Sequence, residues 1–482
     1  MKKLLNQLML CATLVFMSMS MSSCLTTMGL MLIWLDDDEP QQQQQAPVEK
    51  IYSDFEFHVK EVKKGTLDGD FINKLTMKGD GGGIQYISSD PSVATIDASG
   101  RVHILKTGTT SITATIEDRG NYIYNNHVAT YTILVTEGYT YVEYDPTTKE
   151  FKTNVLESAE KYHLLSSSSG DITLDDTSKP YLANSDITIN GTLTFANDAK
   201  LILVDGCIVT VNGKVTASSS TDINIYGQTW MNGSGLLNVK STTDDAINCI
   251  NLYLHSCNVI VETTASGKKG IYAANDIGFY GCLVQGNGGP KGDGIFCGSN
   301  MDIFEGFIVG SSGSNNAGDG GHGIAYEGTA DFIVGNETII SAIGGSVSGG
   351  YDDRAGDGLK FYNKPNIILD GGTLMARGGY NSKRYADMQN YSERYQNDGY
   401  GLNIGNDKKI YYKSGAILIQ SSNPDDMYKG GYGIRATFRN ASEKDIKVCD
   451  GYYQGKEQYY TMKPGGSLQM GIPYFRAPAD GW

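Results

Sequence analysis

The chain has 482 residues, 40% of them hydrophobic, and a formal net charge of −15 from 39 basic and 54 acidic side chains. The apolar content is enough for a core and excludes wholesale disorder, while 60 glycines without a strict triplet period exclude collagen. The acidic balance, with no sustained basic stripe to offset it, excludes nucleic acid as a partner.

The first 23 residues have the pattern of a secretory signal peptide. Two lysines precede the apolar residues 4–21, and the motif Met21-Ser22-Ser23-Cys24 resembles a bacterial lipobox, in which small residues precede an acylated cysteine. The resemblance implies that residues 1–23 are removed and that Cys24 is lipidated. An uncleaved membrane helix is the alternative, because residues 25–35 are also apolar.

Residues 24–50 are expected to form a flexible tether behind the lipidated cysteine. They contain an acidic run at 36–39 and five consecutive glutamines at 41–45, and such polar runs stay solvated. A cysteine that carries several acyl chains is anchored stably in a bilayer. We therefore expect an exported protein that is lipid-anchored to the bacterial membrane, at the outer membrane or cell surface.

Residues 51–137 alternate apolar and polar residues in short runs separated by turn residues, which predicts an antiparallel β-sandwich. Within this stretch, residues 88–97, 100–102 and 108–114 closely resemble the bacterial Ig-like group 2 domain. The resemblance implies a spacer or an adhesion module of a surface protein. The stretch contains no catalytic constellation.

Residues 181–450 repeat a short signature in which glycine or alanine precedes an aliphatic residue. Its small residue occurs at positions 246, 270, 294, 323, 358, 401 and 433, which lie 24, 24, 29, 35, 43 and 32 residues apart. A period near 24, with short β-rich runs and glycines at corners, predicts a right-handed parallel β-helix. The expected fold class is therefore all-β: an Ig-like β-sandwich, a connector or N-terminal cap of the solenoid at 138–180, the parallel β-helix at 181–450, and a C-terminal cap at 451–482.

Five cysteines follow the same period. Cys207, Cys257 and Cys282 occupy one place in the repeat, and Cys249 and Cys297 occupy another. This spacing favours two ladders of reduced, inward-facing thiols that act as small apolar fillers. A disulfide between Cys257 and Cys282 is the alternative, since stacked strands are about 4.8 Å apart.

The longer repeats carry their extra residues at one place, before the next signature. These insertions, at 310–321, 341–356, 376–399 and 420–431, project from one side of stacked coils, and repeat proteins commonly bind ligands on such a side. Aromatic rings stack on sugars and arginine pairs with carboxylates, although tyrosine is also favoured in ordinary sheets. The candidate ligand-binding residues are Tyr351, Arg354, Arg377, Tyr380, Arg384, Tyr385 and Tyr395.

Aspartates of the same side are candidate calcium ligands. Ca²⁺ takes six to eight oxygens from carboxylates and carbonyls. The candidates are Asp352, Asp353, Asp357 and Asp398. For each of them the alternative is a turn, since Asp-Gly pairs are common turn residues.

Residues 235–241 (GLLNVKS) and 245–248 (DAIN), with the Asp-Gly-Ile repeats that follow, resemble a family of exported parallel β-helix carbohydrate-binding proteins. The resemblance covers about residues 180–380. It implies calcium-assisted binding of a polygalacturonate-type polysaccharide on an architecture shared with pectate lyases. The insertion at 376–399 departs from the regular pattern and leaves the ligand open.

These features predict a monomeric surface lipoprotein that binds an acidic, pectin-like polysaccharide with calcium, and they favour binding over catalysis while leaving the question of an enzyme open. The first alternative is a polysaccharide lyase, which needs a base beside the uronate and a cation that stabilises the carbanion-like state. Lys360, three residues after Asp357, is the candidate base. The second alternative is an adhesin that binds a host protein.

Overall fold

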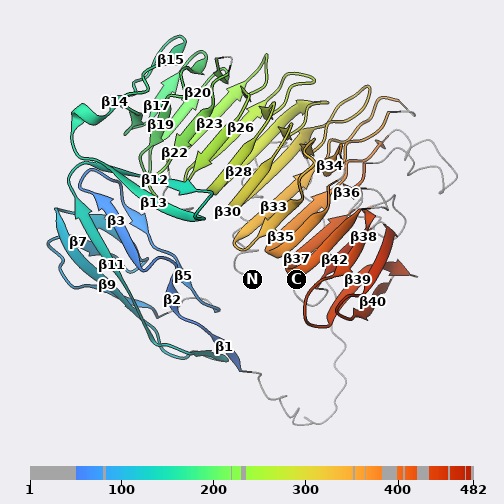
Figure 1. Ribbon diagram of the computed structural model, residues 1–482, viewed down its shortest axis with the longest axis horizontal. Coiled ribbons are helices and arrows are strands. Elements are labelled where there is room, and N and C mark those ends of the chain that lie inside the picture. The colour runs from blue at the N-terminus through green and yellow to red at the C-terminus, as the bar shows by residue number, and fades with distance from the viewer. Residues whose placement is uncertain are drawn as a thin grey trace, which may run out of the picture.

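The protein is all-β (Figure 1). The structure is a computed structural model that describes residues 50–79, 83–218, 220–229, 235–350, 353–363, 365–382, 399–404, 408–420, 434–453, 456–472 and 474–478. These ranges contain 42 strands and a 3-10 helix, η1 (Ala159–Lys161). Within them, no helix combines the length and apolar character needed to cross a membrane.

The N-terminal region, residues 51–137, has a hydrophobic core of its own, built around Phe55, Phe57, Phe71 and Ile112. Its main sheet has the order β3-β11-β9-β6, and in β11 buried residues alternate with exposed or half-buried ones, as expected for a strand with one face on a core. The strands are β1 (Ile51–Ser53), β2 (Glu56–Phe57), β3 (Glu61–Gly65), β4 (Phe71–Ile72), β5 (Leu75–Thr76), β6 (Gln85–Ser88), β7 (Ala94–Ile96), β8 (Arg101–Ile104), β9 (Gly108–Thr115), β10 (Tyr122–Tyr124) and β11 (Val128–Thr136).

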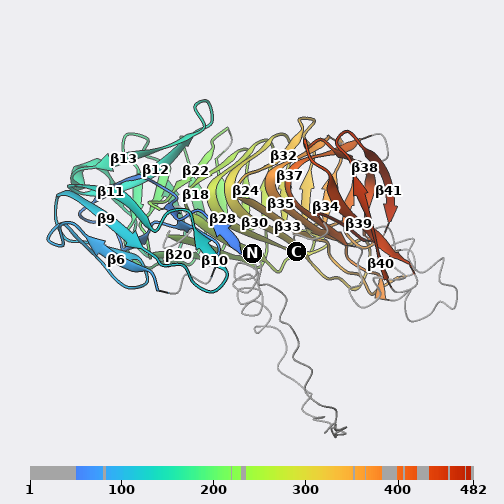
Figure 2. The same ribbon diagram turned by 90° about the horizontal axis from the view of Figure 1, so that it is seen from below.

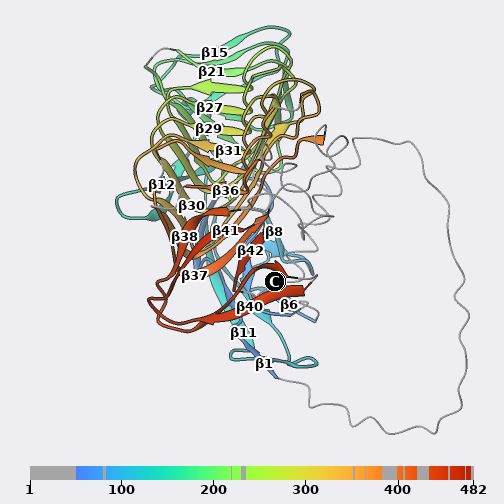
Figure 3. The ribbon, with the colours of Figure 1, turned by 90° about the vertical axis from the view of Figure 1, so that its right-hand side faces the viewer.

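The repeat region, residues 163–477, forms a single sheet of 29 strands. Most strands pair in parallel with a strand two or three places later in the sequence, so they fall into three rows. The short-strand row consists of β15 (Ile172–Leu174), β18 (Leu193–Phe195), β21 (Val215–Ala217), β24 (Ile247–Cys249), β27 (Ile271–Ala273), β29 (Ile295–Cys297), β31 (Ile324–Tyr326), β34 (Leu359–Phe361), β36 (Leu402–Asn403) and β38 (Ile434–Asn440). Figure 3 shows β15, β21, β27, β29 and β31 one below another.

The other two rows share their longest strands. The long-strand row consists of β17 (Ile187–Ile189), β20 (Ile208–Val211), β23 (Leu236–Ser241), β26 (Asn258–Thr263), β28 (Ile277–Pro290), β30 (Met301–Gly313), β33 (Thr338–Ile343), β35 (Ile367–Arg377) and β37 (Lys409–Gln420). The hairpin row consists of β14 (His163–Leu164), β16 (Tyr181–Ala183), β19 (Lys200–Leu203), β22 (Ile223–Tyr226), β25 (Leu252–His255), β32 (Phe332–Gly335) and the first parts of β28, β30, β35 and β37. Parallel pairing begins at β14, inside the stretch 138–180 that we expected to be a connector or an N-terminal cap of the solenoid.

The register confirms the periodicity seen in the sequence. The aliphatic residues of successive signatures pair directly, because Ile247 lies opposite Ile271 and Ile271 opposite Ile295. The series continues through Ile324 and Leu359. A one-residue slip would turn every buried side chain outward, so the apolar pattern holds this register.

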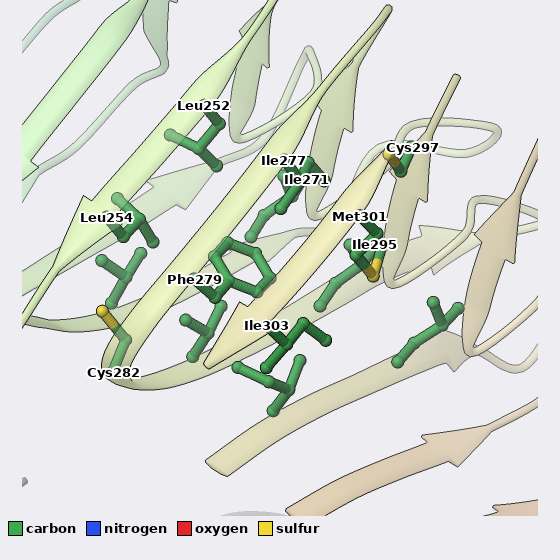
Figure 4. Packing of buried hydrophobic residues seen from close by; sticks show 14 of the residues in the cluster. Leu252, Leu254, Ile271, Ile277, Phe279, Cys282, Ile295, Cys297, Met301 and Ile303 are labelled. Carbon is green, nitrogen blue, oxygen red and sulfur yellow. The ribbon is translucent and has the colours of Figure 1, made fainter. Parts of the chain in front are cut away.

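The interior of the repeat region is filled by aliphatic and aromatic side chains. Figure 4 shows Leu254, Phe279 and Ile303, which lie on successive strands in register. Cys282 and Cys297 lie in the same core, and the six cysteines of the described ranges are buried and form no disulfide. Burial raises the pKa of Cys207 and of Cys297 to about 12, which keeps these thiols protonated. The expectation of inward-facing thiols is confirmed.

The C-terminal end of the repeat region changes from parallel to antiparallel pairing. Here β41 (Ser467–Ile472) pairs with β38, and β42 (Tyr474–Ala477) pairs with β37. A further antiparallel pair is formed by β39 (Ile446–Tyr453) and β40 (Lys456–Met462). The chain thus covers the last parallel strands with strands of its own.

A hairpin links the N-terminal region to the repeat region. Its strands, β12 (Tyr139–Asp145) and β13 (Glu150–Leu156), contribute Tyr139 and Leu156 to the core of the repeat region. The ring of Tyr144 stacks on Tyr280 and Phe304, with centroid distances of 4.5 and 4.6 Å. The Tyr144 amide also donates a hydrogen bond to His255 Nδ1 at 3.0 Å. The hairpin therefore covers the outer side of the middle of the hairpin row, at β25 and the first parts of β28 and β30.

The N-terminal region lies against the first half of the repeat region (Figures 1 and 2) and is joined to it by a buried ion pair. Lys64, at 1% exposure, places Nζ 3.2 Å from Asp205 Oδ2 and donates to the Gln228 carbonyl at 3.1 Å. Nζ and Asp205 Oδ2 also bond to Thr229 Oγ1. Buried charges persist only when they are paired and hydrogen-bonded. Asp205 Oδ2 meets this condition, whereas Oδ1 is buried without a hydrogen-bond partner, which agrees with a carboxylate that burial makes easier to protonate.

A second carboxylate extends this junction. Asp68 accepts hydrogen bonds from the backbone amides of Gly65 and Thr140, both at 2.8 Å, and from the side chain of Gln228. Gln228 in turn donates to the Thr140 carbonyl at 2.9 Å. The N-terminal region, the hairpin and the repeat region thus share one buried polar network.

The pKa of Asp205 predicts how this junction responds to acid. Burial raises the pKa of Asp205 to about 6, against the opposite effect of Lys64. The folded state therefore takes up this proton before the unfolded state, and the contribution of Asp205 to stability rises as the pH falls from 7 to 5. Buried His255, whose pKa is lowered to about 4, contributes with the opposite sign.

We expect the free energy of unfolding of the wild type to rise relative to that of Asp205→Asn as the pH falls from 7 to 5. Comparing the two proteins cancels the contribution of His255, which both contain. Urea denaturation at each pH measures the difference. A difference that does not change with pH would contradict the raised pKa.

Candidate functional site

The three rows differ in what their outer sides offer to a ligand. The hairpin of β12 and β13 covers the hairpin row at β22, β25 and the first parts of β28 and β30. Two ion pairs hold the N-terminal region at the edge of this row: Lys74 to Glu337 at 3.1 Å and His58 to Glu305 at 3.6 Å. The long-strand row presents a mixture of aliphatic and polar side chains, such as Ile208, Lys240 and Glu262. The outer side of the short-strand row, which we call the short-strand face, combines charged and aromatic side chains.

Two aromatic rings form the centre of the short-strand face. Tyr272 and Phe296 are the outward residues of β27 and β29, and they lie opposite each other in the register. Their rings stack with centroids 5.1 Å apart and an interplanar angle of 16°. Lys269 Nζ lies 5.4 and 5.3 Å from the two ring centroids, within the range of cation–π attraction.

A line of polar residues runs beside these strands, each two positions before the aliphatic residue of its signature. They are Asp245, Lys269, Asp293, His322, Asp357 and Tyr400. Three aspartates of this line bond to the backbone of the following repeat: Asp245 accepts from the Lys269 amide at 2.7 Å, Asp293 from the His322 amide at 2.8 Å, and Asp357 from the Tyr400 amide at 2.9 Å. These bonds tie the face to the repeat itself, so its polar groups are held by the fold.

Asp357 binds two cations at once. Its carboxylate is completely buried, and Lys360 Nζ donates to Oδ2 at 3.0 Å while Arg354 Nη2 lies 3.4 Å from Oδ1. The two cations are more accessible, with 20% of the Lys360 side chain and 42% of the Arg354 side chain exposed. The group therefore presents positive charge to solvent above a buried negative charge.

His322 lies next to this group in its neutral form. Its Nδ1 accepts a hydrogen bond from the Asp357 amide at 2.9 Å, so the ring proton is on Nε2. Burial lowers the pKa of His322, with nearby Asp357 and Asp293 acting in the opposite direction. The ring centroid of Tyr362 lies 6.3 Å away, edge to face.

The structure brings together three of the residues singled out in the sequence: Arg354, Asp357 and Lys360. The carboxylate of Asp353 accepts from the amides of Gly318 and Gly350, at 2.9 and 2.7 Å. These contacts make it part of the loop structure.

The remaining sequence candidates lie elsewhere. Arg377 ends β35 in the long-strand row, half-buried and opposite Ile343. Tyr380 follows it and is 40% exposed. Tyr351, Asp352, Arg384, Tyr385, Tyr395 and Asp398 lie outside the described residues, as does Cys24.

Sequence reasoning missed the roles of Tyr272, Phe296 and His322. Their signal was present, because in β27 and β29 the central residue lies between two core residues, and side chains alternate along a strand, which places Tyr272 and Phe296 on the outer side. His322 occupies the same position as Asp293 and Asp357 in its repeat, which marks it as part of the polar line rather than as a turn residue.

The described residues contain no group of three or more His, Cys, Asp or Glu side chains arranged to hold a metal ion. Of the four aspartates expected to bind calcium, two lie outside these residues and Asp357 already has two cationic partners. The calcium prediction therefore remains a prediction.

Comparison with known proteins concerns the N-terminal region. Residues 72–118 match the family described as intimin, immunoglobulin-like domain. No curated protein and no solved structure matches the chain. The match spans β5 to β9 and confirms that the N-terminal region is immunoglobulin-like.

Proposed function

We propose that the chain is a lipid-anchored surface protein that binds an acidic polysaccharide on the short-strand face. In this proposal the repeat region is a right-handed parallel β-helix, and the N-terminal region is a group 2 Ig-like domain that holds it off the membrane. The parallel register and the regular repeat spacing support the first assignment.

The observation that carries the proposal is that aromatic rings and accessible cations share one face of a strongly acidic chain. Lys269, Arg354 and Lys360 lie on this face, whereas its aspartates Asp245, Asp293 and Asp357 are buried, and Asp293 pairs with Lys269 at 3.9 Å. The chain as a whole has a net charge of −15. Local positive charge attracts an anion that the rest of the surface repels. A face built from stacked repeats is also long, which suits a polymer better than a small ligand.

Aromatic rings add affinity for sugars without fixing which sugar. The rings of Tyr272 and Phe296 lie face to face with each other. They therefore offer edges and one outer face each to a ligand, and Lys269 lies close to both rings. Cation and ring together match a sugar that carries both apolar C–H groups and a carboxylate.

Calcium belongs to the proposal through the aspartates of the insertions. Carboxylates that a cation does not already occupy attract Ca²⁺, which prefers oxygen ligands. Asp357 is not such a carboxylate, because it is buried between Lys360 and Arg354, so the calcium part of the proposal rests on the sequence positions of Asp352 and Asp398, which lie outside the described residues.

A polysaccharide lyase is the second candidate, since Lys360 lies within this face. Its ammonium group donates to Asp357 at 3.0 Å. A base has to be a free amine, so Lys360 would have to leave this ion pair during a reaction. An adhesin for a host protein is the third possibility, and it predicts binding that no glycan competes with.

Titration calorimetry of the chain from residue 24, with Cys24→Ser to prevent lipidation, tests the proposal. We expect binding of polygalacturonate, weaker binding of neutral galactan, and no unsaturated products in the same mixtures. Unsaturated products would make the protein a lyase. Absence of binding to both polymers would overturn the proposal and leave the adhesin.

A further inference from the structure

We propose that Arg354 and Lys360, held by the buried Asp357, form a receptor for a sugar carboxylate that works without a metal ion. This inference rests on the proposed function and names the group that the short-strand face recognises. The ligand class is a uronic acid residue within a polysaccharide.

The exposed charges of the group suit an anion. Arg354 and Lys360 are 42% and 20% exposed, whereas Asp357 is completely buried, so an incoming ligand meets the two cations and not this carboxylate. Two further carboxylates lie nearby and already have partners: Asp319 accepts from the Arg354 amide, and Asp293 accepts from the His322 amide, both at 2.8 Å.

The donor geometry suits a carboxylate. Arg354 donates a hydrogen bond from Nη2 to Asp357, and its guanidinium group has further N–H donors in a planar fork. Such a fork bonds both oxygens of a carboxylate in parallel, which adds strength and directional preference. Lys360 has two N–H donors besides the one that binds Asp357.

The two cations are held in place before any ligand binds. The Arg354 amide donates to Asp319 Oδ1 at 2.8 Å, and its guanidinium lies 5.5 Å from the centroid of the Tyr400 ring. Lys360 is fixed by Asp357 and lies 5.8 Å from the Tyr362 ring centroid. Side chains that are ordered in advance lose less conformational entropy on binding.

His322 adds a neutral donor beside the charged pair. Its Nδ1 accepts from the Asp357 amide, which leaves Nε2–H as the donor of the ring. A uronic acid residue carries hydroxyl groups next to its carboxylate, so a neutral donor next to two cations matches its chemistry. This combination favours binding of a uronic acid over binding of a neutral sugar, because a neutral sugar would leave the two cations without an anion.

A calcium ion at this group would meet two positive charges. Arg354 and Lys360 already compensate Asp357, and a divalent cation would have to displace at least one of them from a fully buried carboxylate. Binding of the uronic acid at this group is therefore expected to persist in the presence of a chelator.

The test measures binding of an oligogalacturonate and of a neutral galactose oligomer by calorimetry, in EDTA, with the chain from residue 24 that carries Cys24→Ser. We expect the wild type to bind the acidic oligomer more tightly than the neutral one. Arg354→Gln and Lys360→Gln are each expected to weaken binding of the acidic oligomer about tenfold or more, with little change for the neutral oligomer. Arg354→Lys keeps the charge but loses the fork, and it should retain part of the affinity.

Lys413→Gln is the matched control, because Lys413 forms an exposed ion pair with Asp370 at 3.0 Å in the hairpin row. It removes the same charge and should leave both affinities unchanged. Equal melting temperatures of Arg354→Gln and the wild type separate lost recognition from lost folding, since the Arg354 side chain is 42% exposed.

The outcomes distinguish the inference from the proposed function. Binding of the acidic oligomer that EDTA abolishes, or that both substitutions leave unchanged, would overturn the metal-free receptor and leave polysaccharide binding in place. Equal affinity for the acidic and the neutral oligomer would overturn the assignment to a carboxylate. Equal affinity for the acidic oligomer and for a sulfated neutral oligomer would overturn it as well. Loss of binding to every oligomer and polymer by the wild type would overturn the proposed function itself.

Discussion

Lys64→Met is expected to lower the free energy of unfolding by about 3–5 kcal/mol. Lys64 forms the buried pair with Asp205, and Asp68 lies in the same network. Without the lysine, two carboxylates stay at the junction with no cation between them, because methionine fills the space of the stem but supplies no charge. The loss comes from the uncompensated charge more than from a lost contact.

Urea denaturation followed by circular dichroism measures this effect. Lys60→Met is the control, since Lys60 forms an exposed pair with Glu56 in the same region at 2.9 Å and is expected to change stability by less than about 1 kcal/mol. If Lys64→Met cost as little as Lys60→Met, the junction would be open to water, and the N-terminal region would be mobile relative to the repeats.

Phe279→Ala is expected to destabilise the repeat region by about 3–5 kcal/mol. Phe279 is fully buried on β28, and in the register it lies between Leu254 and Ile303, as Figure 4 shows. Alanine would leave a cavity that neighbouring strands cannot close, because their hydrogen bonds hold them at a fixed spacing of about 4.8 Å.

Thermal denaturation of this variant, compared with Ile333→Ala, measures the effect. Ile333 lies on β32 with its side chain 53% exposed, so its truncation is expected to change stability by about 0.5 kcal/mol or less. Similar losses for both variants would show that the interior tolerates truncation, contrary to a close-packed core.

The sequence predicts the repeat well because the residues that recur with the period are those that face the core. Glycines and aliphatic residues recur at each signature, and the pairs Ile247 with Ile271 and Ile271 with Ile295 follow directly from their spacing. The junction has no such signal. Lys64 and Asp205 are 141 residues apart, and nothing near either residue indicates its partner.

The candidate site is predictable only in part, for a similar reason. The insertions direct attention to Arg354 and Asp357, and both belong to the group that the structure shows. The chemistry assigned to Asp357 depends on its neighbours, however, and a fully buried aspartate between two cations looks the same in sequence as an exposed calcium ligand. Burial and pairing separate these alternatives, and neither can be read from a short motif.

The antiparallel strands at the C-terminal end have a consequence for assembly. Stacked parallel strands leave a row of unpaired backbone donors and acceptors at the growing end, and this row would accept a strand from any second molecule. In this chain β41 and β42 occupy that position against β38 and β37, running in the opposite direction. The outer edges of β37 and β38 are therefore already paired within the chain, so a second molecule cannot continue the parallel stack directly from these two strands.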